Sequence, residues 1–178
     1  SPRSPGATRL FLQFLAGRAR QAEALYILGD LFETWIGDDD IDEPYHAEIV
    51  SALRAASDAG LKISVMHGNR DFLLGSGFTA ASGTLLLKDP YVLSTAEWQF
   101  VLSHGDALCL DDSAYMAFRA QVRSPEWQAT LLAKPLSERR AIAAHMREVS
   151  ESSQRGKDNP YTDLQAAATD DFLREHGY

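Results

Sequence analysis

The sequence has little cysteine, no long apolar run and no excess of basic charge, and each of these excludes a class of protein. Cys109 is the single cysteine among 178 residues, so the chain can form neither an internal disulfide nor a cysteine-rich zinc site. No apolar run approaches the roughly 18–20 residues of a membrane-spanning helix. The formal net charge of −8 argues against a nucleic-acid partner, because nucleic-acid-binding domains carry a basic surface. We therefore expect a globular protein of a reducing compartment.

Helical and strand patterns alternate through the first half of the sequence. Apolar residues recur at helical spacing over residues 7–23 and 43–59, and short apolar runs follow each of them, at 24–28 and 61–66. Alternating helices and strands are typical of a layered fold around a central sheet. The sequence therefore predicts an α/β fold.

The second half of the sequence begins with strand patterns and continues as helix. Residues 84–87, 91–95 and 98–102 are candidate strands, and the last two are close enough to form a hairpin. Residues 112–153 then have the composition of three helical stretches separated at Pro125 and Pro135. After a polar segment, we expect a final helix over 162–176, with Thr162 as its N-cap and Gly177 as its stop.

Three of the short apolar runs end in the same way, with a glycine beside a side chain that can bind a metal. These side chains are Asp30, Asn69 and His104. Because ligands of α/β sheets bind at the carboxyl ends of the strands, we expect the three side chains to meet at one edge. Their oxygen and nitrogen atoms suit manganese, iron or zinc, and the neutral asparagine oxygen favours Mn²⁺. Two such ions would share a hydroxide nucleophile, with Asp30 bridging them.

Each of these residues also has a purely structural interpretation. Asp30 would serve as a turn former or helix cap, and Asn69 as a turn residue. His104 would be a packed structural histidine. Their shared position at the end of a short apolar run favours the metal centre over three separate structural roles.

Two other polar features are expected to lie in solvent. The acidic run Asp38-Asp39-Asp40 is predicted to be a solvated loop, because three adjacent side chains cannot all converge on one metal ion. His46 is predicted to lie on the surface of the helix over 43–59.

These residues resemble the middle three of the five motifs of the calcineurin-like metallophosphoesterases. Arg70 stands where that superfamily has a histidine. With this replacement, the strings LYILGDLFETWIGDD at 25–39 and HGNRDFLLG at 67–75 are similar to the UDP-2,3-diacylglucosamine pyrophosphatases of lipid A biosynthesis. The resemblance covers nearly the whole chain.

The resemblance implies a domain organisation and a chemistry. It divides the chain into a metallophosphoesterase core at 7–111, a helical cap at 112–161 and a return helix at 162–178. A pair of Mn²⁺ ions would promote addition of water to the α-phosphorus of UDP-2,3-diacylglucosamine, giving UMP and 2,3-diacylglucosamine 1-phosphate (lipid X). Asp30 would bridge the metals, and Asn69 and His104 would hold the second. Arg70 would contact the phosphate, where a guanidinium fits developing oxyanion charge.

The resemblance also implies substrate contacts from the cap. The matching positions are Asp112, Ser150, Gln154 and Lys157, with Arg147 as a further phosphate contact. Gln154 departs from the asparagine expected there. The cap sequence mixes apolar residues such as Trp127 and Leu131 with the cations Arg119, Arg123, Lys134, Arg139 and Arg140.

That mixture suits acyl chains and lipid headgroups, although an ordinary amphipathic helical pair has the same composition. We expect a monomer in the cytoplasm, bound peripherally to the inner membrane, with a nucleotide-linked lipid as its partner.

Two motifs of the resembled family are absent from the sequence, an initial Asp-x-His and a final Gly-His-x-His. We therefore expect this polypeptide to hold metal weakly and to be inactive by itself. The alternatives are another two-metal phosphoesterase and a non-catalytic α/β module that has lost its metals.

Overall fold

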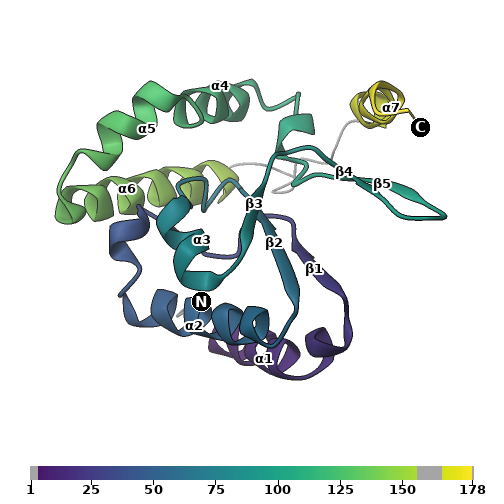
Figure 1. Ribbon diagram of the computed structural model, residues 1–178. Helices are drawn as coiled ribbons and strands as arrows, with labels where there is room; N and C mark the ends of the chain where they lie inside the picture. The colour runs from purple at the N-terminus through teal and green to yellow at the C-terminus, as the bar shows by residue number, and fades with distance from the viewer. Residues whose placement is uncertain (1–3, 156–165, 178) are drawn as a thin grey trace. The chain divides into compact units, whose positions relative to one another are not determined.

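The computed structural model (Figure 1) describes residues 4–155 and 166–177 of a chain that divides into two compact units. Unit 1, Ser1–Asp89, contains α1 (Pro5–Ala16), η1 (Arg18–Gln21), β1 (Ala24–Ile27), η2 (Asp38–Asp40), α2 (Pro44–Asp58), β2 (Lys62–Met66), α3 (Ser76–Ser82) and β3 (Leu85–Leu87). Unit 2, Pro90–Tyr178, contains β4 (Tyr91–Ser94), β5 (Gln99–Leu102), η3 (Asp106–Leu108), α4 (Ser113–Val122), α5 (Pro125–Leu132), α6 (Leu136–Arg155) and α7 (Ala166–Glu175).

Unit 1 is built on a parallel sheet in the order β1-β2-β3, with helices packed beside it (Figure 1). The register pairs Ile27 of β1 with Val65 of β2, so the two strands end at the same edge. The loops that follow them, 28–37 and 67–75, therefore start side by side. This arrangement confirms the predicted α/β fold and places two of the three candidate strand ends together.

Helix α2 shows how the sequence produces the layer beside the sheet. Pro44 occupies the first turn, where its missing N–H costs nothing, and the Glu43 side chain accepts hydrogen bonds from the next two backbone N–H groups. Gly60, with a φ of 100°, follows the end of the helix. The face that is buried carries Ile49, Val50, Leu53 and Ala56 at helical spacing. The predicted helix over 43–59 is thus confirmed.

An aromatic cluster fills the space between the β1 loop and the helices. Phe32 and Trp35 are almost fully buried with ring centroids 4.7 Å apart, and Phe78 of α3 packs edge-on against both. His46 joins this cluster, with Nδ1 3.2 Å from the carbonyl oxygen of Asp40 and Nε2 3.1 Å from that of Thr34. The sequence favoured an exposed position for His46 on the helix surface, and that interpretation is wrong.

Unit 2 begins with the predicted hairpin and continues as helices. Strands β4 and β5 pair antiparallel, with Tyr91 opposite Leu102, and Thr95 and Trp98 close the turn through backbone and hydroxyl hydrogen bonds. Helix α5 starts at Pro125 and helix α6 directly after Pro135, as expected from proline at helix starts.

Some sequence expectations about the fold are wrong, and others stay predictions. The strand that precedes His104, β5, pairs only with β4 among the described strands, so it does not share the parallel sheet with β1 and β2. The helix predicted over 7–23 gives way to a 3₁₀ turn after Ala16, and α3 was not predicted. Thr162 lies outside the described residues, and the core, cap and return-helix boundaries stay predictions. Within the described ranges, no helix is long and apolar enough to span a membrane.

Candidate active site at the strand ends

Asp30 follows β1 in a backbone conformation that few residues adopt. Its φ of 53° lies in the left-handed region, and it is the single non-glycine residue with positive φ among the residues described. Aspartate tolerates this region better than most side chains, yet the conformation still has a cost that the surroundings must offset. Such strain often marks functional positions. The Asp30 carboxylate accepts a hydrogen bond of 3.0 Å from the backbone N–H of Arg70. This bond connects the loop after β1 to the loop after β2.

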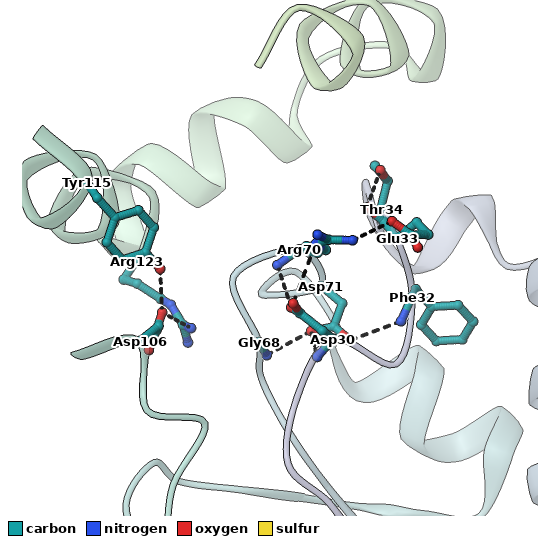
Figure 2. Close-up of polar contacts among 10 residues, drawn as sticks. All are labelled: Asp30, Phe32, Glu33, Thr34, Gly68, Arg70, Asp71, Asp106, Tyr115 and Arg123. Atoms are coloured by element: carbon teal, nitrogen blue, oxygen red, sulfur yellow. Dashed lines mark hydrogen bonds and ion pairs between the residues drawn. The ribbon is translucent and has the colours of Figure 1, made fainter. Parts of the chain in front are cut away.

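The carboxylate of Asp71 joins the two loops (Figure 2). Oδ1 accepts hydrogen bonds from the backbone N–H of Gly68 at 2.8 Å and of Asp30 at 3.3 Å, and Oδ2 accepts one from Phe32 N–H at 3.3 Å. The side chain is fully buried. These three bonds supply the partners that a buried carboxylate requires. No local sequence signal points to this role of Asp71, although the residue belongs to the HGNRDFLLG string.

Gly68 is a glycine because Asp30 comes very close to it. A Cβ atom at position 68 would collide with both the backbone nitrogen and the carboxylate of Asp30. The collision involves backbone atoms, which cannot move away as a flexible side chain can. The glycine therefore permits the approach of the two loops.

Asn69 places its side-chain amide against the Asp30 carboxylate. With its nitrogen toward Asp30, the amide donates hydrogen bonds of 3.0 Å to Oδ1 and 2.9 Å to Oδ2. A half-turn of the amide puts its oxygen at the same place, so that three oxygen atoms face one another. A divalent cation makes that second arrangement favourable, because it attracts all three oxygens. The Asp30–Asn69 pair thus fits a hard metal ion.

Arg70 lies at the same edge and contacts two carboxylates (Figure 2). Its Nη1 is 2.5 Å from Oε2 of Glu33 and its Nε is 3.5 Å from Oδ2 of Asp30. The guanidinium is half exposed, so it is accessible to an anion. Glu33 belongs to the string GDLFE, where no separate sequence signal points to this contact.

His104, the third predicted ligand, belongs to unit 2 and follows β5. Its convergence with Asp30 and Asn69 stays a prediction. Two residues later, Asp106 is buried and contacts two side chains of helix α4 and that of Arg123, the C-cap of the helix. Tyr115 donates at 2.9 Å, Arg119 Nε is 2.9 Å away and Arg123 Nη2 is 3.4 Å away. We call this group the Asp106 cluster.

The Asp106 cluster controls the charge of its members. Burial would raise the pKa of Asp106, but the hydrogen bonds from Arg119 and Tyr115 and the charges of both arginines outweigh it and hold the pKa below the ordinary 3.8. Burial and the Asp106 carboxylate raise the pKa of Tyr115 well above its usual 10.0. The cluster therefore holds an ionised aspartate and a neutral phenol, and it ties the segment after His104 to α4.

The acidic run 38–40 is not the solvated loop that the sequence favoured. Asp38 accepts hydrogen bonds from Gly75 N–H at 3.0 Å, Gly77 N–H at 2.7 Å and Trp35 Nε1–H at 3.1 Å. It therefore caps the first turn of α3. Among the residues that the structure describes, no group of three or more His, Cys, Asp and Glu side chains lies close enough to hold a metal.

The predicted substrate contacts of the cap have mixed outcomes. Asp112 is the N-cap of α4, its Oδ1 accepting from Tyr115 N–H at 3.0 Å, and Arg147 is half-buried in α6. The side chains of Ser150 and Gln154 and the whole of Lys157 lie outside the described parts, so these contacts stay predictions.

Arg139 was expected among the cations that face lipid headgroups. It is buried and its Nε donates to the carbonyl oxygen of Lys134. That expectation is wrong for this residue. Arg119 and Arg123 form ion pairs with Asp106, so they are less available to lipid headgroups than expected.

Comparison with known proteins identifies relatives along nearly the whole chain. No family model matches it. The UDP-2,3-diacylglucosamine hydrolase of Chromobacterium violaceum is 49% identical over 176 residues, covering 98% of this chain and 73% of the relative. The hydrolases of the same name from Chromohalobacter salexigens and Escherichia coli SMS-3-5 are 44% and 46% identical, each covering 97% of this chain and 70% and 71% of the relative. The chain therefore belongs to the family of UDP-2,3-diacylglucosamine hydrolases.

Proposed function

We propose that the protein hydrolyses the pyrophosphate bond of UDP-2,3-diacylglucosamine in lipid A biosynthesis. Water adds to the α-phosphorus, and the bond between that phosphorus and the bridging oxygen breaks. The water oxygen remains on UMP, the bridging oxygen leaves on 2,3-diacylglucosamine 1-phosphate, and the two protons of water pass to the products or the solvent. The names of the relatives support this substrate.

The observation that carries the proposal is the meeting of Asp30, Asn69 and Arg70 at the edge where β1 and β2 end. Two oxygen-bearing side chains and one guanidinium are there within contact distance of one another. The first two suit a divalent cation, which we propose is Mn²⁺, with His104 as a further ligand. When bound, a pair of such ions supplies charge neutralisation at the phosphoryl oxygens and activation of the attacking water.

Arg70 has the role of recognising the anionic part of the substrate. A guanidinium can donate two parallel hydrogen bonds to a phosphate, which fixes orientation as well as charge. In the structure it faces Asp30 and Glu33. Phosphate binding therefore replaces these carboxylate contacts, and Arg70 moves from an internal charge partner to a substrate contact.

A direct test is hydrolysis of UDP-2,3-diacylglucosamine by the product of the gene that carries this sequence, with Mn²⁺ present. We expect UMP and 2,3-diacylglucosamine 1-phosphate, with ¹⁸O from labelled water appearing in UMP. Asn69→Ala should lose most activity, whereas Asp58→Ala, on an exposed face of α2, should retain it. Faster turnover of bis-p-nitrophenyl phosphate than of the lipid substrate would contradict this substrate assignment and favour a general phosphodiesterase.

The same proposal includes a place of action. Because the substrate is a lipid, we propose that the protein works in peripheral contact with the inner membrane. We also propose that it is a monomer and acts in the cytoplasm. Sedimentation with vesicles of anionic lipid, with and without the substrate, tests this association. A protein that stays in the supernatant under both conditions would contradict it.

A further inference from the structure

Asp71 connects the two loops that carry the proposed metal and phosphate contacts. One of its oxygens accepts the N–H groups of Asp30 and Gly68 together, and the other accepts that of Phe32. A single carboxylate thus fixes the start of both loops (Figure 2). The side chain is fully buried, so these bonds form out of contact with bulk water.

We propose that Asp71 is a positioning residue that sets the metal affinity of the Asp30–Asn69 pair; this rests on the metal centre of the proposed function. Asp71 touches neither metal nor substrate in this role. It acts by holding Asp30 in its left-handed conformation and by fixing Gly68, and with it Asn69, at a constant separation from Asp30.

The backbone conformation of Asp30 depends on its hydrogen bonds. Its φ of 53° is unfavourable for a residue with a side chain, so without its hydrogen bonds the loop would relax toward a more common conformation. The N–H that Asp71 accepts belongs to this same residue. Relaxation would turn the Asp30 carboxylate away from the Asn69 amide, with which it makes the contacts of 2.9 and 3.0 Å.

Asp71 also preorganises the proposed metal ligand Asp30. A metal site binds tightly when its ligands already stand in place, and partners that orient the ligands contribute about 10–100-fold to affinity. Asp71 is the group that orients Asp30 from the buried side, whereas Arg70 N–H contacts the Asp30 carboxylate from the other. The negative charge of Asp71 acts in the same direction, because it makes the edge more attractive to a cation.

The test compares Asp71→Asn with Asp38→Asn. Asp38 is a matched control, because its carboxylate also accepts three N–H donors in unit 1 but none from the Asp30 or Gly68 backbone. Each substitution removes one acceptor oxygen. Two properties are measured on the product of the gene that carries this sequence: the affinity for Mn²⁺, from the electron paramagnetic resonance signal of the free ion, and the hydrogen-exchange rates of the Asp30, Phe32 and Gly68 amides.

We expect Asp71→Asn to weaken Mn²⁺ binding by about tenfold or more and to accelerate exchange of these amides. Asp38→Asn should leave both within about twofold. The variants Asp71→Glu and Asp38→Glu repeat the comparison if an asparagine variant fails to fold, and they keep the charge while displacing the acceptors. A weaker Mn²⁺ affinity in Asp71→Glu would support positioning over charge.

Three results would overturn the inference. Unchanged exchange in the Asp71 variants would mean that the carboxylate does not hold the loops. Faster exchange with unchanged Mn²⁺ affinity would reduce Asp71 to a structural residue. A wild-type chain that binds no Mn²⁺ would overturn the metal centre itself, and with it the role of Asp71 toward that centre. Only the last result concerns the wild type. Failure of the proposed metal centre can therefore be distinguished from failure of the positioning role of Asp71.

Discussion

The two units of the chain are stabilised in different ways. All but two of the buried apolar side chains among the described residues lie in unit 1, and the two exceptions are Val122 and Leu131. Exposed large apolar side chains occur in both units but are more frequent in unit 2, where Trp98 and Phe100 are examples. Its buried groups include Asp106 and Arg139, both of which have polar partners. Unit 1 therefore depends on apolar burial, whereas unit 2 depends to a larger extent on directional polar contacts.

The same difference appears in the buried aspartates that follow the strands. Asp71 of unit 1 accepts neutral backbone N–H groups, and Asp106 of unit 2 accepts side chains, two of which are cationic. A backbone donor can move away only if its loop moves with it, whereas an arginine side chain can rotate into water by itself. Two buried aspartates that follow strands can therefore contribute differently to stability, because their partners differ.

The largest expected effect comes from removing an aromatic ring from the core of unit 1. Phe32 is fully buried among Trp35, His46 and Phe78, and Phe32→Ala should lower the free energy of unfolding by about 3–5 kcal/mol. The matched change in unit 2, Phe118→Ala, removes a partly exposed ring and should cost under about 1 kcal/mol. Urea denaturation measures both, and equal losses would break the comparison between the units.

A smaller loss is expected from Asp106→Ala. This change leaves Arg119 and Arg123 without their shared carboxylate in a largely buried setting, which usually costs about 3–5 kcal/mol. Both guanidinium groups keep some exposure, 22% of the side chain, so we expect about 2 kcal/mol. The double variant Asp106→Ala/Arg119→Met should recover part of the loss in urea denaturation. No recovery would show that the loss of the ion pair between Asp106 and Arg119 is not the cause.

The Asp106 cluster should also make stability depend on pH. The pKa of Asp106 is lower in the folded chain, so its contribution is complete above about pH 5 and disappears as the pH falls through the folded value. The pKa of Tyr115 is higher in the folded chain, so its contribution is complete below about pH 9 and is lost at more alkaline pH. Unfolding midpoints of wild type and Asp106→Asn at pH 3, 7 and 11 test this. Parallel profiles would contradict it.

A modest effect is expected at the start of α5. The Ser124 hydroxyl accepts the backbone N–H of Trp127 at 3.2 Å, and Ser124→Ala should reduce stability by about 1 kcal/mol. Ser124→Asp, which can accept the same bond and interacts well with the helix dipole, should restore it. Thermal denaturation distinguishes the variants. A fully stable Ser124→Ala would mean that the cap is not formed in solution.

The smallest effect is expected for an exposed ion pair in unit 2. Lys134 and Glu138 are 3.2 Å apart on the surface, and such pairs contribute little because water and salt screen them. Glu138→Ala should shift the urea midpoint by less than the experimental error. A clear loss would show that surface charge, and not only the Asp106 cluster, stabilises unit 2.

Local sequence patterns predicted much of the fold. Strands β1 and β2, helix α2, the β4–β5 hairpin and the prolines at the starts of α5 and α6 follow from apolar periodicity and backbone chemistry. Helix α3 was missed because Gly75 and Gly77 look like loop residues. These glycines are needed because Asp38 caps the helix at a distance that a Cβ would block. Such a contact between distant segments has no local signal.

The candidate site was predicted in part for the same reason. Asp30 and Asn69 each follow a strand, and parallel pairing of those strands brings them together. The contributions of Asp71 and Glu33 could not be predicted, because they contact backbone N–H groups and a guanidinium 37–41 positions away in the sequence. His46 was misplaced because helical periodicity does not reveal that a loop covers that end of α2.

The left-handed backbone of Asp30 affects how its role should be probed by mutation. Alanine at this position would remove the carboxylate and would also be less tolerant of a φ of 53°, so a lost activity would have two causes. Asparagine has nearly the same shape as aspartate and accepts this conformation readily. Asp30→Asn is therefore the informative replacement, because it changes the ligand charge while leaving the turn that presents the side chain intact.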